Sequence, residues 1–363
     1  MNPDHFYMKL ALSLARKGME GASPNPMVGA VVVKNGKIVG RGYHKIYGGA
    51  HAEVNALNDA GRAAKGGTLY LNLEPCCHFG KTPPCTDAVI KAGIKRVVAG
   101  MTDLNPKVSG KGFDILRKAG IEVDTGVLEA ECRKLNEGFI KRVTTGRPFV
   151  ILKIAASLDG KTATRHKESK WITSEASRLR VHKLRKQVDA IMTGIGTVLA
   201  DDPLLTPRVG RVKKLPLRVV VDSLLRVPPT AKIVGVNTLF VTTDSARVEK
   251  LEFLESRGAQ VKIFKSSNGK VDMTMVMDYL GKKGINSMMI EAGPELSASL
   301  VREGLVDKVI FFYAPRIIGG IDAPGMVGGS GIDKLAEAIP IKDIVAKRCG
   351  EDIIIEGYVH RDS

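Results

Sequence analysis

Three residues of zinc-binding type and one carboxylate lie within 35 residues of the chain. They are His51, Cys76 and Cys85, and Glu53 follows the histidine by two positions. A catalytic zinc ion commonly takes three protein ligands from His and Cys and leaves its fourth position to water. A Glu in a His-x-Glu sequence can move protons between that water and a departing amine. The pattern therefore predicts a hydrolytic deamination with Glu53 as the proton carrier.

The predicted elements around these residues favour a catalytic zinc site. His51 and Glu53 fall in the first turn of a helix predicted over residues 52–60. Cys76 lies in the loop that follows a strand predicted over residues 68–73. Cys85 begins the next predicted helix, and a helix N-terminus stabilises the thiolate that binds metal.

A closed structural zinc site is the alternative interpretation of the same residues. Such a site needs a fourth protein ligand, and the spare candidates in this region are Cys77 and His78. The sequence alone leaves this alternative open.

Size and composition are typical of a globular enzyme. The 363 residues suffice for two domains with separate cores, and 44% of them are hydrophobic. Apolar runs such as residues 28–33 are far shorter than the roughly 20 residues of a membrane helix. The N-terminus has no basic region before an apolar core, so we expect neither a signal peptide nor a membrane partner. Five cysteines, two of them adjacent, are typical of a reducing compartment, and we expect a cytoplasmic protein.

A formal net charge of +17 raises the question of nucleic-acid binding. The excess is spread over the chain: residues 1–146 contain 21 Lys and Arg against 13 Asp and Glu, and the remainder contains 34 against 25. We find no run of five like charges and no basic strip interleaved with aromatic residues. This distribution disfavours a nucleic-acid partner. An anionic small substrate would account for part of the excess charge, and solvated lysines on helix faces for most of it.

The first part of the chain alternates helices with strands. Asn35-Gly36 predicts a hairpin between residues 28–33 and 37–40. Helices are predicted over 4–17, 52–60, 85–92, 110–119 and 129–141, and strands over 68–73, 95–100 and 121–126. This alternation implies a layered α/β domain. We place the boundary before Arg147, so the predicted domains are 1–146 and 147–363.

The second part is again α/β, with more strands. Strands are predicted over 149–155, 189–193, 217–222, 238–242, 260–264, 286–290, 307–313 and 352–358, and helices over 174–187, 246–256, 272–282 and 295–302. No Gly-x-Gly-x-x-Gly fingerprint follows a strand. Glycine turns at Gly194 and Gly293 nevertheless suit a phosphate, which Arg185 and Arg208 could clamp. The residues alone therefore predict a phosphate-binding α/β domain. They do not indicate which reaction it catalyses.

Several longer motifs resemble a single known family. They are Ser-Pro-Asn-Pro-Met-Val-Gly (23–29), His-Ala-Glu (51–53), the segment 73–85 with both cysteines, and the segments 153–161, 169–174, 197–203 and 291–294. In this order they closely resemble the bifunctional riboflavin-biosynthesis deaminase/reductase family. Eight residues separate Cys76 from Cys85, unlike the Cys-x-x-Cys of cytidine and tRNA deaminases, and this departure disfavours nucleic-acid editing.

For the N-terminal domain, the resemblance implies a cytidine-deaminase-like fold of three α/β/α layers. Its Zn²⁺ ion would be bound by His51, Cys76 and Cys85, with Glu53 as the catalytic proton shuttle. The substrate would be a small phosphorylated pyrimidine, a phosphoribosylated diaminopyrimidinone, to which Asn25 would hydrogen-bond.

One position departs from the family pattern. The residue after the first zinc cysteine is usually small and polar, whereas here it is Cys77. Because Cys76 keeps the motif position directly after Pro75, we assign it to the zinc and leave Cys77 as the open alternative.

For the C-terminal domain, the resemblance implies a dihydrofolate-reductase-like α/β fold that uses NADPH to reduce the ribosyl group to a ribityl chain. The NADPH-binding set would be Ala155, Trp171, Thr197, Asp201, Ser223, Gly293, Pro294, Glu295, Leu296, Ser297, Ala298 and Ser299. The substrate-binding set would be Lys153, Ser169, Arg185, Leu205, Arg208 and Glu291. Lys153 and Asp201 are the candidates for proton delivery, and we expect a homo-oligomer.

Three hypotheses follow from these observations. The first is a two-step enzyme with a zinc deaminase and an NADPH reductase in one chain. The second is a base-editing deaminase with an RNA-binding second domain, for which the net charge is the motive. The third is a zinc-stabilised protein that binds a metabolite without converting it.

Overall fold

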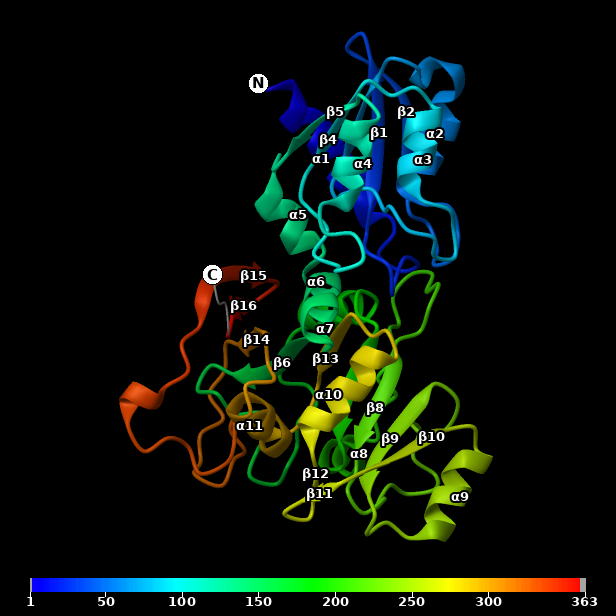
Figure 1. The fold of residues 1–363 in the computed structure, drawn as a ribbon. Coiled ribbons are helices and arrows are strands. Elements are labelled where there is room, and N and C mark those ends of the chain that lie inside the picture. Colours follow the sequence, from blue (N-terminus) through cyan, green and yellow to red (C-terminus); the bar gives the residue numbers. More distant parts are fainter. Residues whose placement is uncertain (1, 360–363) are drawn as a thin grey trace. The chain divides into compact units, whose positions relative to one another are not determined.

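The computed structural model describes residues 2–359 and divides the chain into two compact units, Met1–Arg147 and Pro148–Ser363 (Figure 1). The first unit is built on a five-stranded sheet and the second on a nine-stranded sheet. No helix in the described part of the chain combines the length and apolar character needed to cross a bilayer.

The first unit has the strand order β2-β1-β3-β4-β5. Strand β1 is antiparallel to both of its neighbours, and β3, β4 and β5 run parallel. The elements are α1 (Pro3–Arg16), β1 (Gly29–Lys34), β2 (Lys37–Tyr43), α2 (Ala52–Ala60), η1 (Gly61–Ala64), β3 (Thr68–Leu71), α3 (Cys85–Lys91), β4 (Arg96–Ala99), α4 (Lys111–Lys118), β5 (Glu122–Thr125), α5 (Glu129–Leu135) and α6 (Glu137–Thr145).

Helices cover both faces of this sheet, and two glycines allow them to lie close to it. A Cβ atom on Gly29 would come within 2.1 Å of the carbonyl oxygen of Ala11 in α1. A Cβ atom on Gly42 would come within 2.3 Å of the carbonyl oxygen of Ala52 in α2. The β1–β2 register pairs Ala30 with Gly42, so Gly29 and Gly42 point to opposite faces. Helices α1 and α2 therefore form outer layers on either side of the sheet.

The sequence predicts the elements of this unit closely, except that the short 3₁₀ helix η1 was not predicted and one predicted helix is divided. The helix predicted over 129–141 is two helices, α5 and α6, separated at Asn136. The buried Asn136 side chain accepts a hydrogen bond from the backbone N–H of Met27 at 2.8 Å and donates one to the Met27 carbonyl at 3.0 Å. This contact spans 109 residues, so a local pattern contains no sign of it.

The second unit has the strand order β10-β9-β8-β7-β13-β6-β14-β16-β15. Strands from β10 to β14 in this order are parallel, and β16 and β15 add two antiparallel strands at one edge. The elements are β6 (Phe149–Ser157), α7 (Glu175–Arg185), β7 (Ala190–Gly194), α8 (Ile195–Asp201), β8 (Leu217–Val221), β9 (Thr238–Thr243), α9 (Val248–Ser256), β10 (Gln260–Phe264), β11 (Ser266–Ser267), β12 (Lys270–Val271), α10 (Met273–Lys282), β13 (Ser287–Ile290), α11 (Pro294–Arg302), β14 (Lys308–Ala314), η2 (Leu335–Glu337), β15 (Lys342–Cys349) and β16 (Asp352–Tyr358).

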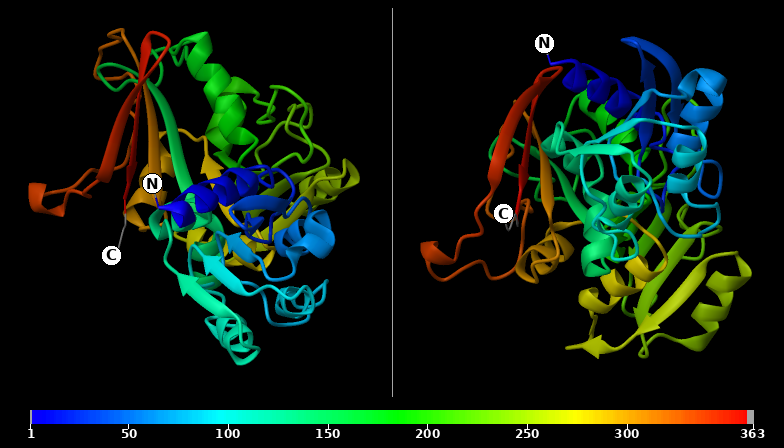
Figure 2. Two further views of the ribbon diagram at one scale, coloured as in Figure 1. Left: turned by 90° about the horizontal axis from the view of Figure 1, so that it is seen from above. Right: turned by 45° about the horizontal axis from the view of Figure 1, so that its top comes forward.

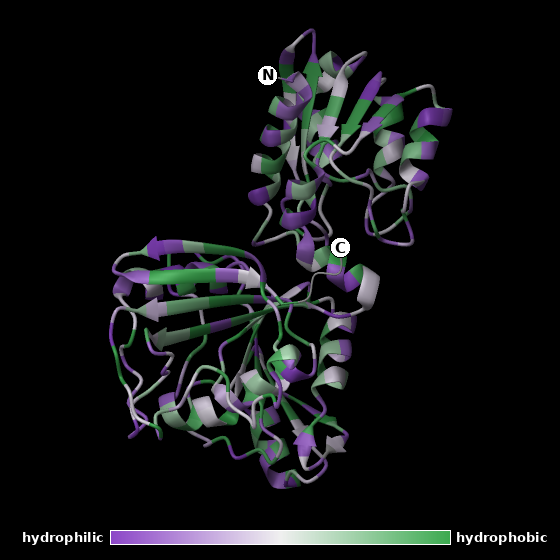
Figure 3. Cartoon of the chain, turned by 90° about the vertical axis from the view of Figure 1, so that its left-hand side faces the viewer, coloured by the Kyte–Doolittle hydropathy of each residue, from purple (hydrophilic) through white to green (hydrophobic). Residues whose placement is uncertain are grey.

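Many residues of the strands are hydrophobic, and the helices contain both hydrophobic and hydrophilic residues (Figure 3). The cores of the second unit occupy both faces of its sheet: Met192 and Ile290 belong to one cluster, and Ile191 belongs to another. Because β6, β13, β7 and β8 pair in parallel, their carboxyl ends lie at the same edge of the sheet, where ligands of parallel α/β sheets bind.

Five elements in the described part of the second unit were not predicted from the sequence: α8, β11, β12, η2 and β15. Two of them, α8 and β15, are the longest. The glycine turn at residues 194–197 opens helix α8, with Gly194 as its N-cap. Strand β15 extends the sheet at its edge, next to β16 (Figure 2). Every residue of β15 except Cys349 is exposed, so this strand has no buried face that would produce a hydrophobic alternation in the sequence.

Candidate functional site

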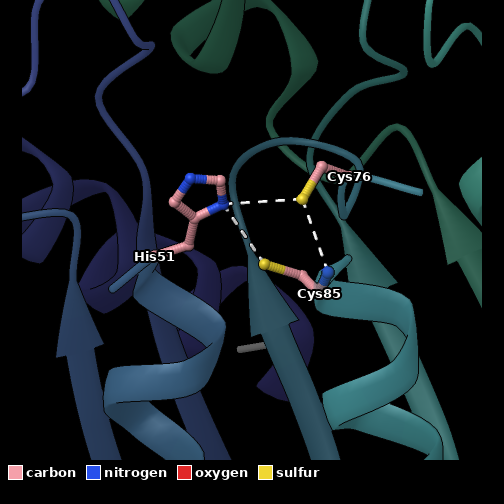
Figure 4. A group of neighbouring side chains, drawn as sticks. All are labelled: His51, Cys76 and Cys85. Atoms are coloured by element: carbon pink, nitrogen blue, oxygen red, sulfur yellow. Dashed lines mark hydrogen bonds between the residues drawn. The ribbon is translucent and has the colours of Figure 1, made fainter. Parts of the chain in front are cut away.

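The predicted metal ligands come together from three elements of the first unit (Figure 4). His51 is the N-cap of α2, Cys76 lies in the loop after β3, and Cys85 is the first residue of α3. Their ligand atoms all lie within 4.8 Å of one another. Neither Cys77 nor His78 belongs to this group. Among the described residues, the cluster thus offers three ligands and matches an open, catalytic type of site.

The spacing of the three side chains fits a tetrahedral zinc ion. His51 Nδ1 lies 3.5 Å from Cys76 Sγ and 3.3 Å from Cys85 Sγ. Zinc with ordinary Zn–N and Zn–S bond lengths separates such atoms by about 3.6 Å. A dication at the centre would contact all three atoms without a large movement of the backbone.

The charge of the cluster also suits a cation. Hydrogen bonding with Cys85 and with His51 lowers the pKa of Cys76 to about 4, in spite of the burial of this thiol. The backbone N–H of Cys85 points to Cys76 Sγ at 3.4 Å and contributes to this effect. The site therefore holds a thiolate at neutral pH, and thiolate is the form that binds metal.

Glu53 lies beside the cluster and is only 3% exposed. Burial, followed by the negative charge of Cys76, raises its pKa to about 7. A carboxyl group with a pKa near the working pH can both accept and donate a proton. This environment suits a general acid and base.

Thr82 orients the histidine of the cluster. Its Oγ1 lies 3.4 Å from His51 Nε2, while His51 Nδ1 faces the two sulfurs. With Nε2–H donating to Thr82, the lone pair of Nδ1 is left for the metal. Such partners of a ligating histidine fix both its tautomer and its ring orientation.

We expect Thr82→Val to weaken zinc binding by about 10- to 100-fold, because His51 loses the partner that fixes its tautomer. Competition with a chromophoric chelator measures the zinc affinity. Thr125→Val, at an exposed position of β5, is the matched control. Equal affinities of the two variants would contradict this role.

A second histidine, His44, supports the predicted substrate residue Asn25. The ring of His44 is 2% exposed and packs edge-on against His51, with 5.0 Å between the ring centroids. Its Nδ1 lies 3.2 Å from the Ala50 carbonyl, to which it donates, so its Nε2 accepts from Asn25 Nδ2 at 3.2 Å. The Asn25 amide is thereby oriented with its oxygen left for another partner.

In the second unit, three predicted substrate residues form a buried charge network. Glu291 accepts hydrogen bonds from Arg185 Nε at 2.6 Å and from Arg185 Nη2 at 3.0 Å, and Lys153 Nζ lies 3.5 Å from Glu291 Oε2. Their side chains are only 11–13% exposed. Burial alone would raise the pKa of Glu291, but Arg185 and Lys153 lower it to about 2. Burial lowers the pKa of Lys153.

The two glycine turns that were predicted to bind phosphate lie side by side. A Cβ atom on Gly293 would have Thr197 Oγ1 as a neighbour at 3.9 Å, and one on Gly194 would have the Leu296 side chain at 3.5 Å. Gly293 is the N-cap of the nine-residue helix α11. Backbone N–H groups of this turn are therefore available to an anion.

The other residues predicted to bind NADPH or substrate lie on strands, helices and loops of the second unit, in different degrees of burial. Ser169 Oγ donates to Asp201 at 2.9 Å, and the Trp171 ring, 61% exposed, lies 4.7 Å from the Arg178 guanidinium. The Leu205 side chain is buried in the core, so only its backbone can meet a ligand. Ala155 lies on β6, Ser223 follows β8, and Arg208 is exposed in the loop after α8.

Comparisons with known proteins cover both units. Residues 1–101 match the family model described as the cytidine and deoxycytidylate deaminase zinc-binding region, and residues 148–355 match the RibD C-terminal domain. The riboflavin biosynthesis protein RibD of Aquifex aeolicus is 47% identical over 97% of this chain and 97% of its own, and that of Escherichia coli is 44% identical over 97% and 98%. The chain belongs to the RibD family.

Solved structures of RibD proteins agree with this assignment. The structure of Acinetobacter baumannii RibD (form 1) superposes with a TM-score of 0.90 at 38% identity, over 99% of both chains. A deaminase/reductase from Thermotoga maritima superposes with a TM-score of 0.86 at 35% identity, again over 99% of both chains. The predicted fold classes, a cytidine-deaminase-like domain and a reductase domain, are confirmed.

Membership of the RibD family decides between the three hypotheses. The protein is a bifunctional deaminase and reductase of riboflavin biosynthesis, with a zinc-binding deaminase domain. The RibD reductase domain implies NADPH as the second cofactor. The first hypothesis, an enzyme with a deaminase and a reductase in one chain, is confirmed.

Sequence reasoning missed His44 and Thr82. His44 is a single histidine at the end of a strand and Thr82 is a threonine in a loop, so neither belongs to a motif with a characteristic spacing. Only their contacts with Asn25 and His51 reveal them.

Proposed function

We propose that the deaminase unit hydrolyses 2,5-diamino-6-(5-phosphoribosylamino)pyrimidin-4(3H)-one, and that the reductase unit converts the ribosyl group of the product to a ribityl group. The observation that carries this proposal is the similarity, over 99% of both chains, to the Thermotoga maritima protein. That protein is a diaminohydroxyphosphoribosylaminopyrimidine deaminase and 5-amino-6-(5-phosphoribosylamino)uracil reductase. Residues 1–146 would perform the first step and 147–363 the second.

In the deamination, His51, Cys76 and Cys85 would bind the zinc ion. Zinc, when bound there, supplies a Lewis acid that makes water nucleophilic near neutral pH. Glu53 would accept a proton from the attacking water and deliver it to the amino nitrogen, as a C–O bond forms, the C–N bond breaks and ammonia departs. The burial of Glu53 and its raised pKa support this role.

Asn25 would orient the pyrimidine in the same site. Its amide donates to His44, so its oxygen can accept a hydrogen bond from an amino group or ring N–H of the substrate.

In the reduction, bound NADPH would be the source of the hydride that converts the ribosyl group to a ribityl group. The α11 turn from Gly293 to Ser299 would bind its phosphates, with Ala155, Trp171, Thr197, Asp201 and Ser223 around the rest of the cofactor. The side-by-side glycine turns support this arrangement.

Lys153, Ser169, Arg185, Leu205, Arg208 and Glu291 would hold the phosphorylated substrate. Lys153 and Asp201 are the candidates for the proton that accompanies the hydride. The basic character of this region supports an anionic ligand: α7 and the loop after α8 together carry Arg178, Arg180, Lys183, Arg185, Arg208, Arg211, Lys213 and Lys214.

Metal removal tests the two-step assignment. With the named diaminopyrimidinone, we expect ammonia release followed by NADPH oxidation. A chelator should abolish ammonia release, whereas oxidation of NADPH with supplied deaminated substrate should continue, because the zinc ligands all lie in the first unit. Ammonia release by the zinc-free protein, or no release by the zinc-loaded protein, would refute the assignment.

We also propose that the protein forms a homo-oligomer through β15. This edge strand pairs only with β16 among the described strands, and it exposes Ile344 (61%) and Val345 (42%). Exposed edge strands are templates for pairing with another chain. We expect Ile344→Lys to lower the mass found by sedimentation velocity, and a monomeric unsubstituted protein would contradict the proposal.

A cytoplasmic location is the corresponding proposal for the compartment. All five cysteines are free, which is typical of a reducing environment. Cell fractionation tests it, and recovery of the protein outside the cytoplasm would overturn it.

A further inference from the structure

One buried carboxylate of the first unit holds a segment that the deamination described above does not use. Glu74 lies between β3 and Cys76 and is 3% exposed. Its Oε2 accepts hydrogen bonds from the backbone N–H groups of Asp103 at 3.0 Å and Gly110 at 2.9 Å, and its Oε1 accepts one from Gly112 at 2.9 Å. A single side chain thus holds the connection between β4 and α4 at two points, Asp103 and Gly110, and the first turn of α4 at a third, Gly112.

The backbone around this carboxylate is packed very closely. A Cβ atom on Gly112 would lie 2.3 Å from the Pro75 carbonyl oxygen and 3.0 Å from Glu74 Oε1. The first turn of α4 therefore rests directly on the loop that carries Cys76. The carboxylate also sits at the N-terminus of α4, where the helix dipole favours a negative charge.

The tied segment, residues 102–110, contacts the loop that carries Cys76, through the neighbouring residue Cys77. Cys77 Sγ points to the Lys107 carbonyl at 3.9 Å. Asp103 is 6% exposed, and its carboxylate accepts the N–H of Asn105 at 2.8 Å, which folds the segment into a turn. Because β3 and β4 are adjacent parallel strands, the Cys76 loop and this segment leave the sheet at the same edge.

We propose that Glu74 is a positioning residue for the deamination: it sets the distance between the Cys76 loop and segment 102–110, and so shapes the wall of the site against which the pyrimidine binds. The inference rests on the proposed deaminase function. Glu74 acts through backbone N–H groups: its side-chain hydrogen bonds go to Asp103, Gly110 and Gly112, which are not metal ligands.

Glu74→Gln tests the proposal with little change in volume. A glutamine has one acceptor oxygen, so its NH₂ group must face at least one of the three N–H donors, and the segment moves away. A misplacement of about 1 Å can cost roughly 100-fold in rate. We expect kcat/KM for deamination to fall about 10- to 100-fold, mainly through KM, while zinc content and NADPH oxidation with deaminated substrate stay unchanged. Glu131→Gln, at an exposed position of α5, is the control.

The reactivity of Cys77 reports on the segment independently of turnover. In the zinc-loaded protein with Cys349→Ser, Cys76 and Cys85 are occupied and Cys132 is fully buried, so alkylation reports on Cys77. Glu74→Gln should accelerate this alkylation, and Glu74→Asp, which keeps the charge but is one methylene shorter, should give values of KM and alkylation rate between those of the two proteins.

The outcomes separate the two proposals. Failure of the unsubstituted protein to release ammonia would refute the deaminase assignment. Normal ammonia release by that protein, together with an unchanged KM and unchanged Cys77 alkylation in both Glu74 variants, would overturn the role of Glu74. A fall in zinc content that matches the fall in kcat/KM would also overturn it, because Glu74 would then act only on metal binding.

Discussion

Glu53→Gln should lower the rate of ammonia release by about 100- to 10,000-fold, the usual contribution of a general acid and base. Glutamine keeps the size of the side chain but cannot accept a proton from water. His51, Cys76 and Cys85 are untouched, so zinc content should stay at the level of the unsubstituted protein. Ammonia release with the diaminopyrimidinone and metal analysis are the two measurements.

The second active site supplies an internal control for this variant. NADPH oxidation with supplied deaminated substrate should proceed at the normal rate, since the reductase residues lie in the other unit. Glu131→Gln removes one acidic group from the same unit at an exposed position and should leave both activities unchanged. Undiminished ammonia release by the Glu53 variant would remove this residue from the mechanism.

Glu291→Gln should have the largest effect on the second unit. Its carboxylate compensates two buried cations, Arg185 and Lys153. Removal of one partner of a buried charge network commonly costs about 3–5 kcal/mol, because the other charges stay buried without compensation. We expect the unfolding transition of the second unit to move down accordingly, and NADPH oxidation to be largely lost.

Urea unfolding and the NADPH assay measure these effects, with Glu252→Gln on the exposed side of α9 as control. The folded-state pKa of Glu291, about 2, lies below its ordinary value of 4.5. Its stabilisation is therefore complete above pH 4.5 and is lost as the pH falls towards 2. The Glu291 variant should lack this part of the pH dependence. Equal unfolding free energies for the variant and the unsubstituted protein would show that the network does not stabilise the unit.

The local pattern of hydrophobic residues was sufficient to predict the helices and strands that bury one face. Helix α2 and strand β16 have the predicted bounds, 52–60 and 352–358. In both, a buried face imposes a period on the sequence. Strand β15 has no buried face, and α8 is short and has glycines at its N-cap and second position, so neither produces a clear period.

The predicted metal ligands could be named from the sequence because metal binding restricts residue type. Few patterns other than a zinc site place His, Glu and two Cys in this way. The residues that orient these predicted ligands and their surroundings are less restricted in type. Thr82, His44 and Glu74 are common residue types, and what distinguishes them is the atom each one faces.

The sequence by itself determined the kind of reaction, the two-domain organisation and the family, because ligand types and motif order are local properties of the chain. Only the tertiary structure decided which side chains orient these groups. It brought His51 Nδ1 to both sulfurs, paired Glu291 with Arg185 across 106 residues, and tied segment 102–110 to Glu74. These contacts depend on which strands become neighbours, and strand order is a property of the folded sheet as a whole.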